Sequence, residues 1–517
     1  MTFKDHLLTL LYHFQHIISM KTIKDLVDFL IHLEKKFTQS EIKMQELMLH
    51  PNYDVSAKNL AKYLVLRSHE LRPIQNQLHH LGLSSLAASE SHTHYQLLNV
   101  LKWLAPEYKG KACTLSDDVG REMISQRTRK LFGEKHADHN IPYLMVTIDE
   151  RKAGDVKYFE KLLINGMNIA RINFAHADEL TVNQIVNTLQ TAIINTGLPC
   201  KIHMDLAGPK LRTLIPNKKK KIELQLNDVI YLQATTTNEN FPKKTILISE
   251  TRVFETLQSG HRIYFDDGKF HGIVEEVKNQ TAVIRIVKTP LNNAVLKQDK
   301  GINLPDTHLN TQSLTAEDIK NLKMIASYAD LIGYSFVRKT EDIQLLRTYL
   351  KEFGIHKPVI YKIETSEAVD SFVELLYEAM KDPLFGIMIA RGDSAIEIGF
   401  ERLAEIQEEL LWLCEAAHTP VIWATQVLES LNKTGLITRS EISDAVMASM
   451  SECVMLNKGK NIVQTMQTLK DILRRESSHR EKKRFTMRPL GIVKKFVSEH
   501  LNDSQSEGSI MKLPSDV

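Results

Sequence analysis

The chain has 517 residues, of which 43% are hydrophobic and 25% charged, with a formal net charge of +3 at pH 7. These values are ordinary for a globular protein of two to four domains, and the small net charge gives no reason to expect binding to nucleic acid or to a membrane surface. No apolar run is long enough to span a bilayer, the N-terminus lacks signal-peptide features, and the four cysteines are scattered without metal-ligand spacing. We therefore expect a cytoplasmic protein with buried thiols and no disulfide framework.

Residues 1–140 are predicted to be helical. Apolar residues recur at helical spacing over residues 23–33. Ser56 is predicted to cap a helix, and Pro73 to open another that ends near Gly82. Because amphipathic helices usually bury their apolar face, we expect a bundle that packs against the rest of the protein or against a second subunit. A regulatory or partner-binding role is the alternative.

From Pro142 the periodicity changes, and short apolar runs alternate with helical stretches. The runs are residues 143–148, 167–173, 200–205, 330–337, 358–364, 385–391, 419–425 and 452–456. Alternating strand and helix signals indicate a parallel α/β architecture. Eight such runs predict a closed TIM (β/α)8 barrel, which we place over residues 141–213 and 301–475.

Two segments depart from the barrel pattern. Between residues 214 and 300, five strand-like runs separated by turn residues predict an all-β domain inserted after the third barrel strand. The basic run at residues 218–221 is interpreted as a solvated loop rather than a nucleotide contact. Residues 476–517 are polar and basic, and we predict a linker followed by a disordered tail.

Several predicted strands end in charged residues. The run at 358–364 ends with Lys362 and Glu364, and the run at 385–391 is followed by Asp393. In a (β/α)8 barrel the strand ends meet at the C-terminal face, where active sites lie, so these three side chains should converge. One cation and two carboxylates suit a divalent metal bound together with a phosphorylated substrate. The alternative for Lys362 is a plain salt bridge to Glu364.

Two further runs also end in polar groups. One ends at Thr425, and the other carries Arg171, Asn173 and His176. Taken alone, a threonine at a strand end or an isolated histidine is more often a structural residue.

Nine stretches between Pro142 and Arg475 resemble the pyruvate kinase family, in the family's order. They are residues 166–176, 205–213, 266–268, 301–305, 335–338, 362–364, 390–393, 424–430 and 438–444. The resemblance, which covers neither flank, is to a short bacterial type with an N-terminal helical extension. It implies a lid domain at the all-β insertion and transfer of the phosphoryl group of phosphoenolpyruvate to ADP, giving pyruvate and ATP in glycolysis.

The resemblance also implies roles at the reacting centre. Glu364 and Asp393 would hold Mg²⁺ or Mn²⁺, and Lys362 would contact the transferring phosphoryl group and the enolate oxygen. Arg171 would grip the phosphate through its guanidinium fork. Thr425 would help to deliver a proton to the enolate carbon.

Other residues would bind the rest of the substrates. The backbone amides of Gly392 and Asp393 would bind the substrate carboxylate as the first turn of a helix does. The resemblance places His176, Arg212 and Asn173 near the nucleotide phosphates.

The chain departs from the family pattern after its first barrel strand. Asp149 and Glu150 stand where the family has Gly-Pro, which places two carboxylates near an incoming polyphosphate. Lys458, after the eighth strand, is the residue expected to restore part of the charge balance.

A second departure concerns K⁺, which many members require. Asn173 and Asp205 match two of the K⁺ ligands, whereas Ala175 and Leu206 replace the other two, and Lys210 stands where K⁺-requiring members have a glutamate. The resemblance implies that the ammonium of Lys210 replaces K⁺, which would then not be required. The alternative is that this lysine points into solvent.

Too few residues follow Arg475 for the family's further α/β effector domain, so we expect no response to fructose 1,6-bisphosphate. Two other functions stay open. One is a metal-dependent aldolase or lyase acting on pyruvate or oxaloacetate enolates, and the other is a non-catalytic regulatory relative. A homo-oligomer is expected in each case.

Overall fold

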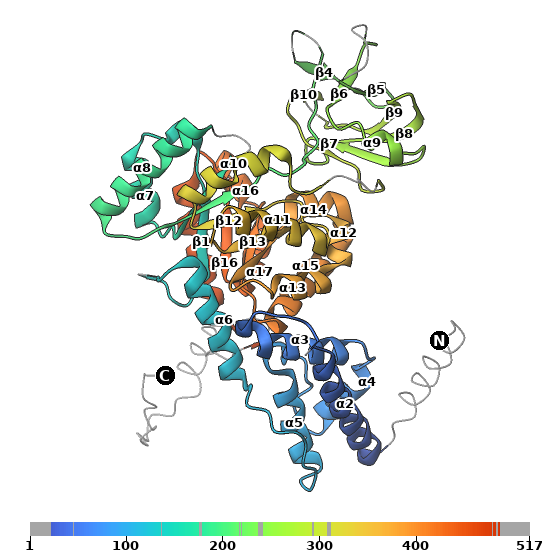
Figure 1. Ribbon diagram of the computed structural model, residues 1–517, viewed down its shortest axis with the longest axis vertical. Helices are drawn as coiled ribbons and strands as arrows, with labels where there is room; N and C mark the ends of the chain where they lie inside the picture. The colour runs from blue at the N-terminus through green and yellow to red at the C-terminus, as the bar shows by residue number, and fades with distance from the viewer. Residues whose placement is uncertain are drawn as a thin grey trace, which may run out of the picture.

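The computed structural model describes residues 22–485, except 45, 136, 175–177, 217, 219, 236–240, 292–293, 308–311, 478 and 482–483. Figure 1 shows a helical region at one end of the molecule, a barrel in the middle and a β-rich domain at the other end. The predicted α/β barrel, its all-β insertion and its helical N-terminal region are confirmed.

Eight parallel strands close the barrel, in the order β1-β16-β15-β14-β13-β12-β3-β2. Each predicted run supplies one strand. The strands are β1 Tyr143–Thr147, β2 Ile169–Asn173, β3 Lys201–Asp205, β12 Leu331–Tyr334, β13 Val359–Ile363, β14 Phe385–Ala390, β15 Val421–Ala424 and β16 Cys453–Leu456. Nearly every strand residue is buried, because the barrel interior and the surrounding helices cover both faces of the sheet.

The barrel strands are joined by helices that cover its outer surface. The longer ones are α7 Val156–Ile164, α8 Glu179–Thr196, α10 Ala316–Tyr328, α11 Thr340–Glu352, α13 Phe372–Ala379, α15 Phe400–Ala416, α17 Arg439–Met447 and α18 Ile462–Glu476. Short helices α12 Ser366–Asp370, α14 Arg391–Ile398 and α16 Glu429–Thr434 follow strand ends. Local signals fix several helix ends: Thr315 and Asp318 form a capping box at α10, and Gly197 ends α8 with a φ of 69°.

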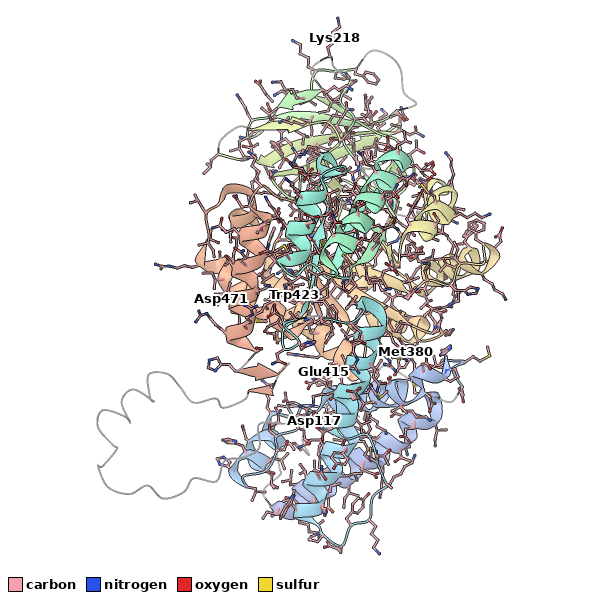
Figure 2. The ribbon with its side chains drawn as sticks, turned by 90° about the vertical axis from the view of Figure 1, so that its left-hand side faces the viewer. Asp117, Lys218, Met380, Glu415, Trp423 and Asp471 are labelled. Atoms are coloured by element: carbon pink, nitrogen blue, oxygen red, sulfur yellow. The ribbon has the colours of Figure 1, made fainter. Side chains whose placement is uncertain are left out.

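The β-rich insertion, which we call the lid, follows β3. Its strands are β4 Lys221–Glu223, β5 Val229–Ala234, β6 Thr245–Ile248, β7 Arg262–Phe265, β8 Phe270–Lys278, β9 Thr281–Lys288, β10 Val295–Lys297 and β11 Ile302–Asn303. Six of them form one sheet in the order β11-β7-β8-β9-β5-β6, which buries its own apolar core. A short helix, α9 Val253–Thr256, was not predicted. The described lysines of the basic run are exposed, and Figure 2 shows Lys218 at the tip of the lid.

The N-terminal region consists of α2 Ile23–Met44, α3 Asp54–Arg67, α4 Arg72–His80, α5 Thr93–Leu104 and α6 Asp117–Phe132. It packs against the barrel through α3 and α15. The predicted cap at Ser56 is wrong, because α3 begins at Asp54. The Ser56 hydroxyl is buried and lies 3.0 Å from Nδ1 of His418, which precedes β15.

After α18, two short strands pair in antiparallel fashion, β17 Arg480–Glu481 with β18 Arg484–Phe485, where a linker was expected. Residues 486–517, which include the predicted tail, lie outside the described residues. All four cysteines are free; Cys414 and Cys453 are buried, as predicted, whereas Cys113 and Cys200 are only partly buried. Among the helices of the described part of the chain, none has the length and apolar character needed to cross a membrane.

Candidate active site

A cavity of about 360 Å³ lies between the carboxyl ends of the barrel strands and the lid. Nine of the residues singled out from the sequence line it: Arg171, Asn173, Lys210, Arg212, Lys362, Glu364, Gly392, Asp393 and Thr425. His176, the tenth, lies outside the described residues. Residues far apart in the sequence therefore meet at one place.

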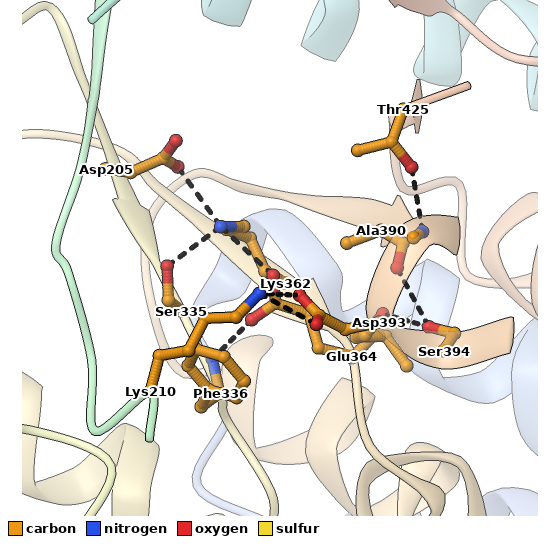
Figure 3. A network of polar contacts seen from close by, with 12 residues as sticks. Asp205, Lys210, Ser335, Phe336, Lys362, Glu364, Ala390, Asp393, Ser394 and Thr425 are labelled. Atoms are coloured by element: carbon orange, nitrogen blue, oxygen red, sulfur yellow. Dashed lines mark hydrogen bonds and ion pairs between the residues drawn. The ribbon is translucent and has the colours of Figure 1, made fainter. Parts of the chain in front are cut away.

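Lys362, near the end of β13, occupies the centre of a polar network (Figure 3). Its Nζ lies 2.8 Å from Oγ of Ser335, 3.1 Å from Oε1 of Glu364 and 3.7 Å from Oδ1 of Asp205. The salt bridge considered as an alternative role for this lysine is thus present. It also fixes the ammonium at the cavity wall, where it can meet a ligand.

Glu364, whose Oε1 pairs with Lys362, is also held through its second carboxylate oxygen. Its Oε2 accepts a hydrogen bond from the backbone N–H of Phe336 at 2.8 Å. Burial raises the pKa of Glu364, although Lys362 opposes the shift. Phe336 has a φ of 56°, an uncommon conformation for a bulky residue, and such strain concentrates at functional sites.

Asp393 lies in the first turn of α14 and is paired with Lys210. Nζ of Lys210 lies 2.8 and 3.0 Å from the two carboxylate oxygens. Burial alone would raise the pKa of Asp393, but Lys210 outweighs it and the pKa is lowered. In turn, Asp393 raises the pKa of Lys210 against the effect of burial. Lys210 therefore points into the cavity and not into solvent.

The two carboxylates fit a divalent ion that depends on a ligand to complete its coordination. Glu364 and Asp393 follow the neighbouring strands β13 and β14. Among the described residues, no group of three or more His, Cys, Asp and Glu side chains could hold a metal on its own. Mg²⁺ commonly uses one or two carboxylates together with water and substrate oxygens. Because burial disfavours the ionised form of Glu364, a cation beside it would favour that form.

Arg171 lies in the middle of β2 and is held rigidly. Its Nε and Nη2 donate to Oδ2 of Asp205 at 2.7 and 2.6 Å, and its Nη1 donates to Oγ1 of Thr147 at 3.0 Å. Although Asp205 is buried, Arg171, Lys362 and His203 hold its pKa well below the usual range. The sequence pattern gave no sign that Asp205 would hold Arg171.

Thr425 follows β15 with a φ of 65°, which is strained for a β-branched residue. Its Oγ1 accepts a hydrogen bond from the N–H of Gly392 at 2.8 Å. Buried Arg391 donates to the carbonyl oxygens of Ala424, at 3.2 Å, and Thr425 and forms an ion pair with Asp444. These bonds hold the strained turn in place, and Thr425 already accepts a hydrogen bond from the amide of Gly392.

The lid side of the cavity adds groups to which the sequence reasoning assigned no role. They are Asp266, Asp267, Asp299 and Lys300. Nζ of Lys300 lies 3.0 Å from Oδ1 of Asp266. Nη1 of Arg212 donates to the carbonyl oxygen of Asp299 at 3.1 Å. This side of the cavity thus carries two cations, Arg212 and Lys300, beside three aspartates.

Both carboxylates of the altered first strand are neutralised. Asp149 accepts hydrogen bonds from Nε and Nη2 of Arg151 at 2.8 and 2.6 Å. Glu150 pairs with Lys458 at 2.6 Å, which confirms the expectation that this lysine balances the added charge. Neither carboxylate is among the residues that line the cavity.

The fold and the cavity define a lid-bearing (β/α)8 barrel with a polar cavity, lined by cations and carboxylates, at the carboxyl ends of its strands. Residues 144–461, more than half of the chain, match the family described as "Pyruvate kinase, barrel domain". The protein belongs to the pyruvate kinase family.

Curated relatives agree with this assignment. The chain is 33% identical to a pyruvate kinase of Dictyostelium discoideum over 57% of this chain and 58% of that one. It is 31% identical to the "Pyruvate kinase, cytosolic isozyme" of Glycine max over 58% of each chain. It is also 31% identical to "Pyruvate kinase PKLR" of Homo sapiens over 58% of this chain and 53% of that one. The chain thus spans less than two thirds of the length of each.

Proposed function

We propose that the protein is a pyruvate kinase that transfers the phosphoryl group of phosphoenolpyruvate to ADP. The observation that carries this proposal is the cavity beneath the lid, where Arg171, Lys362, Glu364, Asp393 and Thr425 meet. Phosphoryl transfer requires positioning and charge neutralisation more than covalent chemistry, and this set supplies both. Membership of the family supports the same reaction.

Arg171 binds the phosphoryl group of the substrate. Three hydrogen bonds to Asp205 and Thr147 fix its guanidinium before any ligand arrives. The remaining N–H groups can point into the cavity, where a guanidinium matches the geometry of phosphate oxygens. Fixing the cation in advance lowers the cost of reorganisation during the reaction.

Lys362 stabilises the charge that develops as the phosphoryl group leaves. Its ammonium, held by Ser335 and Glu364, lies where it can donate to the enolate oxygen. Glu364 and Asp393 would hold Mg²⁺ or Mn²⁺, and such an ion, when bound, would supply positive charge that offsets the charge developing in the reaction. Thr425 lies across the cavity and helps to deliver a proton, through water, to the enolate carbon.

The acceptor nucleotide binds on the lid side. Arg212 and Lys300 supply positive charge there, and Asn173 lies at the end of β2 in the same cavity. His176 belongs to this part of the proposal through the family resemblance. Since Asp149 and Glu150 are each paired with a cation, their repulsion of an incoming polyphosphate is reduced.

Lys210 takes the place of K⁺ in this proposal. Its ammonium lies 2.8 Å from Asp393 inside the site. A tethered ammonium supplies one positive charge without a free ion, so the enzyme works without K⁺. The proposal also includes a cytoplasmic location, supported by the Glycine max relative that is named a cytosolic isozyme, and a homo-oligomeric state.

A coupled assay tests the reaction. Pyruvate release is followed with lactate dehydrogenase and NADH, while phosphoenolpyruvate, ADP and Mg²⁺ are omitted in turn, with Lys362→Met as the control protein. The proposal requires pyruvate only when all three are present. Pyruvate from oxaloacetate without ADP would support the lyase alternative, and binding of phosphoenolpyruvate without turnover would support a non-catalytic relative.

A further inference from the structure

The lid is joined to the barrel by two linkers that run side by side. The outgoing linker contains Leu211 and Thr213, and the returning linker contains Lys300 and Ile302. The N–H of Ile302 donates to the carbonyl oxygen of Leu211 at 2.9 Å, and the N–H of Thr213 donates to that of Lys300 at 2.8 Å. The two linkers therefore pair in antiparallel fashion, and a movement of the lid displaces both of them together.

Both linkers reach Asp393. Lys210 comes from the outgoing linker and lies 2.8 and 3.0 Å from the carboxylate oxygens. Asn303 comes from the returning linker, in β11, and its Nδ2 lies 3.4 Å from Oδ1 of the same carboxylate. The carboxylate proposed to hold the metal is thus held from the side of the lid.

Asn303 also ties the returning linker to the barrel. Its Nδ2 donates to Oε1 of Glu397 at 3.0 Å, one helical turn beyond Asp393 on α14. Asn303 is only 5% exposed, and its Oδ1 has no hydrogen-bond partner among the described residues. Breaking the Nδ2 contacts would leave a second polar atom of this buried amide without a partner, which opposes its displacement.

The surroundings of Glu397 favour a neutral side chain at this position. Burial raises its pKa to about 7, and nearby Asp393 adds to the shift. The preceding residue, Ile396, packs against the lid turn at Gly268, where an added Cβ would lie 3.5 Å from its Cγ1. Helix α14 therefore touches the lid at two adjacent residues.

We infer that Asn303 and Glu397 are positioning residues that lock the returning lid linker to α14, so that the lid and Asp393 change position together. The inference rests on the proposed function for the identity of the metal-binding carboxylates. The lock itself stands on the contacts of the two linkers with α14.

The test uses the full chain with Mn²⁺ alone as the probe. Three variants are compared: Asn303→Ala, Glu397→Ala and Glu397→Gln. The matched control is Asn432→Ala, which removes another buried amide, 1% exposed and bonded through Nδ2 to the carbonyl oxygen of Asn457; neither residue lines the cavity. Mn²⁺ affinity is measured by electron paramagnetic resonance. Opening of the linkers is measured by hydrogen exchange of the Thr213 and Ile302 amides, and stability is measured by thermal unfolding.

Asn303→Ala and Glu397→Ala should each weaken Mn²⁺ binding by roughly 10- to 100-fold, as expected for residues that orient a metal ligand. They should also speed exchange of both linker amides, whereas Glu397→Gln and Asn432→Ala should leave affinity and exchange near wild type. If both alanine variants keep the wild-type Mn²⁺ affinity and the wild-type exchange rates of the linker amides, the inference that Asn303 and Glu397 lock the linker to α14 is wrong. If the wild type does not bind Mn²⁺, the proposed metal site is wrong. The hydrogen-exchange measurement then still tests whether Asn303 and Glu397 hold the linker against α14.

Discussion

The two ends of the barrel differ in backbone strain and in the surroundings of their buried polar groups. At the end beneath the lid, Thr425 and Phe336 have strained backbones and Glu364 has a raised pKa. At the other end, the helical region packs against the barrel (Figure 2, where Met380 and Glu415 lie at this boundary), and buried Arg127 and His418 find polar partners within the protein, although the buried hydroxyl of Tyr53 has none among the described residues.

Arg127 shows the contrast most clearly. It lies 4.0 Å from the ring centre of Tyr53 and donates to the carbonyl oxygens of Asn52, Ala417 and His418 at 2.6, 3.2 and 2.7 Å. His418 in turn lies 2.8 Å from the carbonyl oxygen of Ser91. Buried polar groups with a full set of hydrogen bonds stabilise the fold. Backbone strain, in contrast, is concentrated at functional sites. The comparison predicts which substitutions should damage turnover and which should damage folding.

The largest effect is expected for Lys362→Met. Removing a cation that meets developing charge should lower kcat by about 100- to 1,000-fold or more. The variant keeps a long apolar side chain, so the fold should be retained. Steady-state kinetics together with circular dichroism checks both points, and near-wild-type turnover in the folded variant would remove Lys362 from the mechanism.

Glu364→Gln should weaken metal dependence and activity together. The change removes one of two carboxylates but keeps an acceptor for the N–H of Phe336. The Mg²⁺ concentration that gives half-maximal activity should rise by at least about tenfold. If the Mg²⁺ titration matches the wild type, the metal lies elsewhere.

Arg127→Met, at the end of the barrel covered by the helical region, should lower stability and leave turnover nearly unchanged. Three carbonyl oxygens would lose their donor, and the free energy of unfolding should fall by about 2–4 kcal/mol. Turnover of the folded variant should stay within about twofold of the wild type, since the residue lies at the opposite end of the barrel. Denaturant unfolding and kcat are measured on the same preparation, and a large loss of kcat without loss of stability would contradict the division of roles.

The same contrast explains what the sequence could predict. The eight strands are bounded apolar runs, and the strand-end rule then brought Lys362, Glu364 and Asp393 together. The pairing of Lys210 with Asp393 depends on how the lid docks, and no local pattern encodes it. Ser56 was misread for a similar reason, because its hydroxyl bonds His418, 362 residues away, instead of capping a helix.

A smaller effect is expected from acid at the end covered by the helical region. Burial lowers the pKa of His418 from 6.5 to about 3, so below pH 6.5 the unfolded chain binds a proton that the folded chain does not. This contribution to stability is complete above pH 6.5 and is lost as the pH falls towards 3. Between pH 7 and 5 it should lower the free energy of unfolding by about 2 kcal/mol. His418→Gln should remove that part of the pH dependence, and equal pH slopes in the two proteins would exclude His418 as its source.

The smallest effect is expected for K⁺, whose removal should not change the wild-type rate. Lys210 already holds a positive charge 2.8 Å from Asp393, and Ala175 and Leu206 offer no side-chain oxygen to a cation. Replacing K⁺ and Na⁺ with tetramethylammonium should therefore leave the wild-type rate unchanged. Lys210→Glu should lose most activity, because it sets a third carboxylate beside Glu364 and Asp393, and like charges at such distances oppose one another. Lys210→Met separates loss of the cation from gain of an anion, and added K⁺ should restore neither variant. A several-fold rise of the wild-type rate with K⁺ would show that a free ion, and not the tethered ammonium, completes the charge of the site.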